Sequence, residues 1–132
     1  MPLIATETDR YSNVVKHEYE PSIGFCREVV TVNEATAQTY AVGTVLGKIT
    51  ASGKYVIAKD GAVDGSNVAA AIVLEDKTVA ATTDTKVLVM VRGNAIVSKA
   101  ALKLDASYNT QGKKDAVYAA LEAKNILVNT TV

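Results

Sequence analysis

Short apolar runs separated by glycines occupy the middle of the chain, from about residue 42 to residue 97. Runs of this length bounded by glycine are typical of strands joined by tight turns. The pattern predicts strands at 42–49, 54–59, 68–74, 86–91 and 95–97, with a turn-rich segment at 60–67. The glycines expected to serve as structural turn residues are Gly43, Gly47, Gly53, Gly61, Gly65 and Gly93. Gly43 and Gly47 interrupt a strand, which indicates bulges or close backbone approach.

The segments around this block predict one more strand before it and two helices after it. Alternation over 24–32 places Cys26 on the more apolar face of a strand, as a small buried hydrophobe. We expect 33–40 to be a loop or one helical turn, and 75–84 to be a polar linker. Ser98 offers an N-cap for a short helix at 99–104. The expected further elements are a longer helix at 114–124, an end of that helix at Asn125, and a final strand at 126–128.

Residues 1–20 differ from the rest because they lack glycine and show no clean hydrophobic period. We interpret them as an extended N-terminal arm in which 11–19 becomes a strand if it finds a partner edge. A disordered tail is the alternative for any N-terminus. Residues 21–132 then form the body. The fold class expected is α+β: a β-rich compact single domain with short strands, one short and one longer C-terminal helix, and the arm.

Composition excludes several classes of partner. The chain has 132 residues, 14 basic and 14 acidic side chains, and a formal net charge of zero. Phosphate neutralisation needs an excess of Lys and Arg, so neither a nucleic acid nor an anionic membrane surface is expected as a partner. With one Phe, six Tyr and no Trp, the core is light, which favours extra burial through oligomerisation. We find no signal peptide or membrane span in the sequence, so synthesis in a cytoplasm is expected.

Residues that could carry chemistry are few. His17 is the only histidine and lies in the expected arm, where a solvated polar role is the plainer interpretation than catalysis. One Cys and one His cannot make a structural zinc site. Asp60, Asp64 and Asn67 resemble part of a calcium loop, but the third position fails and Asp-Gly turns explain them. No phosphate-binding or nucleophile motif is present. We therefore expect no catalytic residues, no metal and no cofactor.

Several segments together resemble the lambda-type head decoration proteins of tailed bacteriophages. The segments that carry the resemblance are 43–50 (GTVLGKIT), 52–55 (SGKY), 64–76 (DGSNVAAAIVLED), 92–97 (RGNAIV) and 119–128 (AALEAKNILV). Each is weak alone, whereas their order and spacing are specific over about residues 24–132. Asn125 departs from the pattern, since the family often has glycine there, but asparagine tolerates the same backbone region.

The resemblance implies a homotrimer on the outside of a phage capsid, without catalytic activity, that bridges the major capsid proteins and reinforces the expanded shell. It also implies that an N-terminal arm can pair with capsid strands. The candidate capsid-binding residues of the arm are Arg10, Tyr11, Val14, Val15, His17 and Tyr19. The alternative from another class is a small β-rich binding module for a carbohydrate or cell-surface ligand, against which the absence of Trp counts. A small hydrolase has no candidate nucleophile–base pair.

Overall fold

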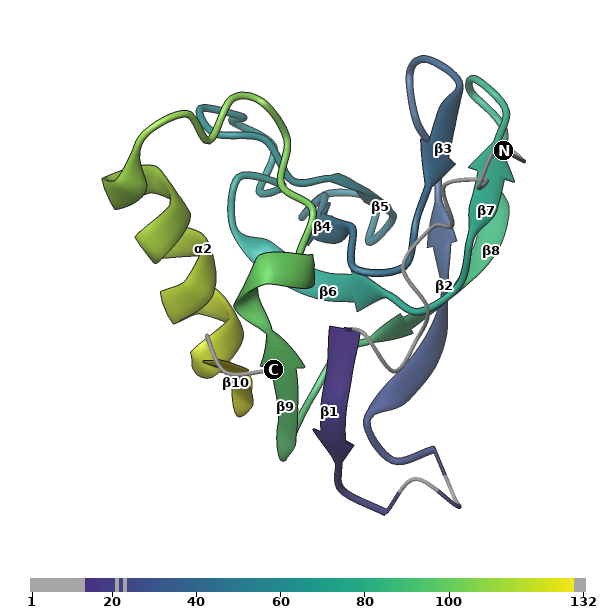
Figure 1. Cartoon of the computed structure of the whole chain (residues 1–132). Helices are drawn as coiled ribbons and strands as arrows, with labels where there is room; N and C mark the ends of the chain where they lie inside the picture. The colour runs from purple at the N-terminus through teal and green to yellow at the C-terminus, as the bar shows by residue number, and fades with distance from the viewer. Residues whose placement is uncertain (1–13, 21, 23, 130–132) are drawn as a thin grey trace, which may run out of the picture.

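The computed structural model describes residues 14–20, 22 and 24–129, and three groups of strands organise them (Figure 1). Five strands close into a barrel in the order β2-β5-β4-β6-β8, three form a sheet in the order β1-β9-β10, and β3 pairs with β7 in a two-stranded ribbon. The strands are β1 (Val15–Glu18), β2 (Arg27–Val32), β3 (Gln38–Tyr40), β4 (Val45–Lys48), β5 (Tyr55–Ile57), β6 (Ala69–Val73), β7 (Lys77–Val79), β8 (Thr85–Met90), β9 (Ala95–Ser98) and β10 (Ile126–Asn129).

The barrel is filled by aliphatic side chains from its own strands. Antiparallel pairs join β2 to β8, β8 to β6, β6 to β4 and β4 to β5. Its core contains Leu46, Val32 and Val87, each fully buried, and it extends to Tyr40 and Val79 of the β3–β7 ribbon. The expected light core of aliphatic residues is therefore what the barrel contains.

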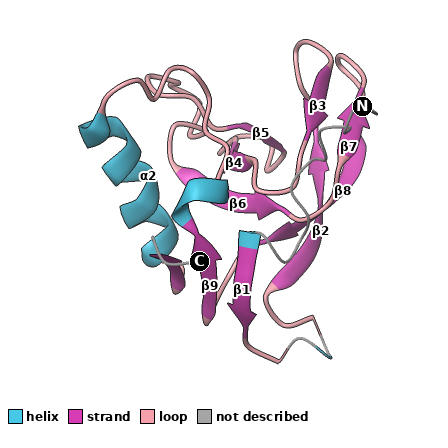
Figure 2. Ribbon diagram, in the orientation of Figure 1, coloured by secondary structure: helices cyan, strands magenta, loops and turns pink. Residues whose placement is uncertain are grey.

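A second apolar cluster lies between the barrel and the three-stranded sheet. The helix α2 (Gln111–Glu122) runs beside β9 and β10 along one side of the molecule (Figure 2). It buries Val117 and Leu121 against Ile126 of β10 and Ile72 of β6. β10 runs parallel to β9, and β1 is antiparallel to β9 on its other side. The sheet thus packs one face on the core and leaves the other face to solvent.

The short helix predicted at 99–104 is wrong. Only one 3₁₀ turn, Lys99–Ala101, forms, and the Ser98 side chain makes no capping bond. The chain extends at Leu102 because the backbone of Lys103 pairs with the start of β4: its N–H donates to the Gly43 carbonyl, and its carbonyl accepts from Val45 N–H. Long-range pairing therefore overrides the local cap.

Other expectations hold in part. The longer helix begins at Gln111, earlier than expected, because the Thr110 hydroxyl accepts a hydrogen bond from Lys113 N–H and caps it. Asn125 has φ 63°, which confirms the left-handed residue between the helix and β10. The segments expected as a loop and as a linker instead contain β3 and β7. Those strands are short and polar, and they exist because they pair with each other.

Gly47 allows the barrel strand β4 to lie directly against the β5–β6 loop. The pairing of β4 with β6 shifts register between Leu46 and Gly47, as a bulge does. A Cβ at Gly47 would stand 2.1 Å from the carbonyl oxygen of Ser66. No side chain larger than hydrogen fits there without movement of the backbone.

Candidate interaction surface

The first described segment, residues 14–20, is built into the three-stranded sheet. Val14 and Val15 are buried in the core cluster between the sheet and the barrel. A register shift between Val15 and His17 in the β1–β9 pairing turns Lys16 and His17 outward in succession. Of the residues 11–19 expected to form a strand on a partner edge, Val15–Glu18 form one on β9 of their own chain, and 11–13 lie outside the described residues.

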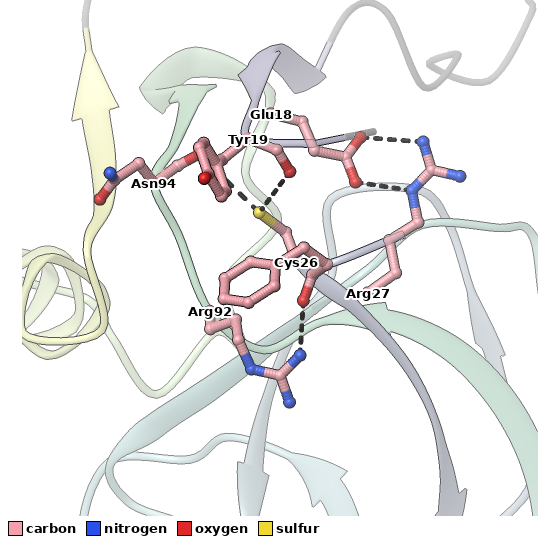
Figure 3. Close-up of polar contacts among 7 residues, drawn as sticks. Glu18, Tyr19, Cys26, Arg27, Arg92 and Asn94 are labelled. Carbon is pink, nitrogen blue, oxygen red and sulfur yellow. Dashed lines mark hydrogen bonds and ion pairs between the residues drawn. The ribbon is translucent and has the colours of Figure 1, made fainter. Parts of the chain in front are cut away.

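Glu18 anchors the end of β1 to the start of β2 (Figure 3). Its side chain is buried, and both carboxylate oxygens accept hydrogen bonds from Arg27, at 2.7 Å from Nε and 2.8 Å from Nη2. A bidentate, charge-assisted pair of this kind fixes orientation as well as adding stability. The chain between Glu18 and Arg27 is thus held at both ends.

Two exposed aromatic rings meet at this turn. The Tyr19 and Phe25 rings lie 5.5 Å apart, edge to face at 85°, and are 46% and 42% exposed. The Arg92 guanidinium lies 5.7 Å from the Phe25 ring and donates to the Phe25 carbonyl oxygen, and it also pairs with Glu28 at 3.1 Å. We call Tyr19, Phe25 and Arg92 the aromatic corner. Arginine and exposed aromatic residues are the side chains that protein interfaces favour.

Cys26 lies beside the aromatic corner and contacts the backbone of Tyr19 and Asn94 (Figure 3). Its Sγ lies 3.6 Å from the carbonyl oxygen of Tyr19 and 3.8 Å from that of Asn94, and Tyr19 N–H donates to the same Asn94 oxygen at 2.8 Å. Burial raises the pKa of the Cys26 thiol, which keeps it protonated and unreactive at neutral pH. The expectation that Cys26 is a buried small side chain is confirmed.

A shallow groove of about 420 Å³ adjoins the corner on the solvent face of the three-stranded sheet. His17 of β1, Ile96 of β9 and Leu127 of β10 lie side by side across this face, because they are register partners. Asn94, Ala95, Glu122 and Asn125 also line the groove. Leu127 is 46% exposed, so the groove offers apolar area with a polar border. Asn94 lines the groove, and its carbonyl oxygen accepts the hydrogen bond from Tyr19 N–H, so the groove lies next to the aromatic corner. We call the groove and the corner together the interaction surface.

The kinds of side chain on this surface indicate what it can bind. Among the residues that the structure describes, no three His, Cys, Asp or Glu side chains are grouped so that they could hold a metal ion. In the same part of the chain, no helix has the length and apolar content needed to cross a membrane. What the surface does present is aromatic and aliphatic area beside an arginine, which suits another protein.

The candidate residues of the expected arm have different positions in the structure. Arg10 and Tyr11 lie outside the described residues. Val14 and Val15 are buried and cannot contact a partner in this conformation, whereas His17 and Tyr19 are exposed on the interaction surface. The six turn glycines are dispersed over the body: Gly43, Gly53, Gly61 and Gly65 have positive φ, and Gly47 and Gly93 lie against backbone where a Cβ would clash.

Phe25, Arg92 and Leu127 belong to the interaction surface, and they were not among the candidates predicted from the sequence. A signal for the first was available: Phe25 and Val29 fall on the less apolar face of the 24–32 strand, and two large apolar residues on a solvent face indicate an interface. Arg92 and Leu127 carried no such signal. Only the fold brings them next to residues far away in the sequence.

The β barrel and its flanking sheet carry a surface of exposed aromatic, aliphatic and arginine side chains, which are residue types that protein interfaces favour. The chain belongs to the family of the bacteriophage lambda head decoration protein D, whose family model matches residues 4–126. No curated protein matches the chain. The family is one of structural proteins of the phage head, so the resemblance found in the sequence is confirmed.

Proposed function

We propose that the chain binds the outside of a phage head as a homotrimer and stabilises the expanded shell by bridging copies of the major capsid protein. Membership of the head decoration family supports attachment to a capsid. The observation that carries the proposal is the exposed aromatic corner joined to the apolar groove. In this proposal the protein is made in the host cytoplasm, acts without catalysis or a cofactor, and ends on the capsid exterior.

The test is to mix the purified chain with expanded capsids of the phage that encodes it. Stoichiometric binding and a rise in the temperature at which the shell disrupts are expected. A lack of both would overturn the proposal.

Substitution of the aromatic corner is expected to weaken capsid binding. Phe25→Ala removes exposed ring area and the stacking partner of Arg92, and should lower affinity about tenfold, as loss of one interface anchor commonly does. Val63→Ala is the matched control, since Val63 is fully exposed on the β5–β6 loop and belongs to neither the corner nor the groove. Sedimentation with capsids measures both variants. Equal binding by the two would show that the corner is not a contact.

Removal of residues 1–13 tests the proposed arm. We propose that Arg10 and Tyr11, with the neighbouring His17 and Tyr19, contact the shell, and that the body begins at Val14 in practice. A chain of residues 14–132 keeps Val14 and Val15 in the core, so its unfolding temperature should change little. Its affinity for capsids should fall about tenfold or more if the arm adds a strand to the shell. Unchanged affinity would mean that the arm does not bind.

A further inference from the structure

The barrel strand β2 is paired along its whole length on one side only. On the β8 side, register partners run from Arg27↔Met90 to Val32↔Thr85. On the β5 side there is one partner pair, Val32↔Tyr55, which is parallel. One register pair therefore joins the two strands at this seam, and among the described residues no strand pairs with the N-terminal part of β2 there.

The direction of the backbone groups of Val29 follows from the hydrogen bonds around it. Val91 N–H donates to the Cys26 carbonyl, so the backbone groups of Cys26 point toward β8. In an antiparallel pair the backbone groups of every second residue along the strand do the same. Val29 belongs to the other set of residues, whose backbone N–H and C=O groups point away from β8. The backbone of its register partner Leu88 likewise points away from β2. The Leu88 N–H donates to the Glu75 carboxylate, and the Leu88 carbonyl accepts from Leu74 N–H.

Asn33 belongs to the same alternate set and donates to the Tyr55 carbonyl across the seam. The N–H and C=O of Val29 thus point toward the β5 side of the barrel, where β5 pairs with β2 only at Val32 and not at Val29.

A cavity of about 340 Å³ lies in front of these groups. Val29, Thr31, Lys48, Lys54 and Tyr55 are among the residues that line it. The Val29 side chain is 58% exposed, which is unusual for a valine on a barrel strand. An exposed strand edge with a half-exposed β-branched residue is a template for another strand.

The charges at the seam favour an acidic partner. Glu28 is paired with Arg92, and Asp84 with Lys54 at 2.9 Å. Lys48 makes no ion pair within the described residues, and its Nζ lies 6.0 Å from the centre of the Tyr55 ring. An uncompensated ammonium beside an open edge attracts a carboxylate, and it repels a basic segment.

We propose that an extended segment of the shell protein that carries acidic side chains adds to β2 at Val29 as a further strand, an inference that rests on the proposed seat on the capsid. The backbone of the added strand exchanges hydrogen bonds with Val29 N–H and C=O. One of its carboxylates lies at Lys48. This mode gives affinity through the main chain and specificity through the side chains at the seam.

Val29→Pro tests the added strand without removing a bond of the barrel. The Val29 N–H faces the seam, so proline deletes only the donor that the added strand would use, and its ring blocks the edge. Affinity for expanded capsids should fall about tenfold, from loss of the Val29 N–H donor and of access to the edge. Val29→Thr, which keeps the donor, should bind within about twofold of the wild type. Equal affinities of the two variants would overturn the inference.

Amide hydrogen exchange of the unmodified protein provides a readout that does not depend on the fold of a variant. The Val29 amide should exchange rapidly in the free protein and slowly on the capsid. Rapid exchange of Val29 on capsids that bind the protein would overturn the inference while leaving the proposed function intact. Protection of Val29 already in the free protein, rising with its concentration, would show a second copy at the seam and would also overturn it. Failure of the protein to bind capsids at all would overturn the proposed function instead.

Discussion

Gly47→Ala is expected to lower the free energy of unfolding by about 3 kcal/mol, the upper part of the range for overpacking in a core. The alanine Cβ would stand 2.1 Å from the carbonyl oxygen of Ser66 and 2.7 Å from its carbonyl carbon. Both are backbone atoms of the β5–β6 loop, so no side-chain rotation relieves the contact. Either β4 or the loop must move, and β4 is paired on both sides within the barrel.

Gly112→Ala is the matched control for this substitution. Gly112 lies in the first turn of α2, and a Cβ there meets nothing within 4 Å. Alanine should stabilise the helix by about 0.5–1 kcal/mol, because glycine is the poorer helix former. Urea unfolding followed by far-UV circular dichroism measures both variants. A cost below about 1 kcal/mol for Gly47→Ala would contradict the close approach of β4 to the loop.

Glu34→Ala is expected to cost about 4 kcal/mol, because the buried Tyr40 hydroxyl and the partly buried Ile57 N–H both lose their acceptor, at roughly 1–3 kcal/mol each. Glu34 is 5% exposed, and its Oε2 accepts from the Tyr40 hydroxyl and, at 2.8 Å, from Ile57 N–H. The carboxylate therefore joins β3 to β5 through one atom. Tyr40→Phe removes one of the two bonds and should cost about half as much. Glu122→Ala on the surface of α2 should change stability by less than about 0.5 kcal/mol.

The same contact predicts how stability depends on alkaline pH. Burial, the hydrogen bond to Glu34 and the negative charge of Glu34 all raise the pKa of Tyr40 above its ordinary value of about 10. The folded state then holds this proton more tightly than the unfolded state. Its contribution is complete below about pH 10 and is lost as the pH rises further. Unfolding temperatures measured between pH 8 and 11, chosen to span that value, should fall less steeply for Tyr40→Phe than for the wild type. Equal slopes would contradict the buried contact.

The parts of the fold that sequence predicted are those with a local signal. Strands 68–74 and 86–91 are short apolar runs rich in Val, Ile and Leu next to turn residues, which favours buried strands, and they correspond to β6 and β8. Asn125 could be placed because few residues adopt positive φ. The missed elements have no local signal: β3 is Gln38–Tyr40 and β7 is Lys77–Val79, each too short to show a period. They form by pairing over a long stretch of chain.

The interaction surface shows the same division. Tyr19 was a candidate because it lies near the N-terminus, where the resemblance implies a capsid contact. Its neighbours in space, Phe25 and Arg92, are brought there by the β1–β9 and β2–β8 pairings. Val14 and Val15 look from the sequence like part of an arm, but burial against the core decides their position. Local pattern cannot show which side of a sheet remains uncovered.

Stability and function rest on different parts of the molecule in this account. Gly47 and Glu34 are buried at or beside the barrel, so their substitution should lower the stability of the protein rather than alter its contacts with a partner. Phe25 and Val29 are exposed and contribute little to the core, so their substitution should alter binding with little effect on unfolding. The separation makes capsid binding interpretable for surface variants whose unfolding temperatures match that of the wild type.

Electron cryo-microscopy of expanded capsids mixed with the purified chain is the most direct test of the central claim. Added density is expected on the capsid exterior, arranged as trimers, with the aromatic corner of each copy against the major capsid protein or a neighbouring copy. Capsids that remain bare at saturating protein, or density with the Tyr19–Phe25 corner facing solvent in every copy, would contradict it.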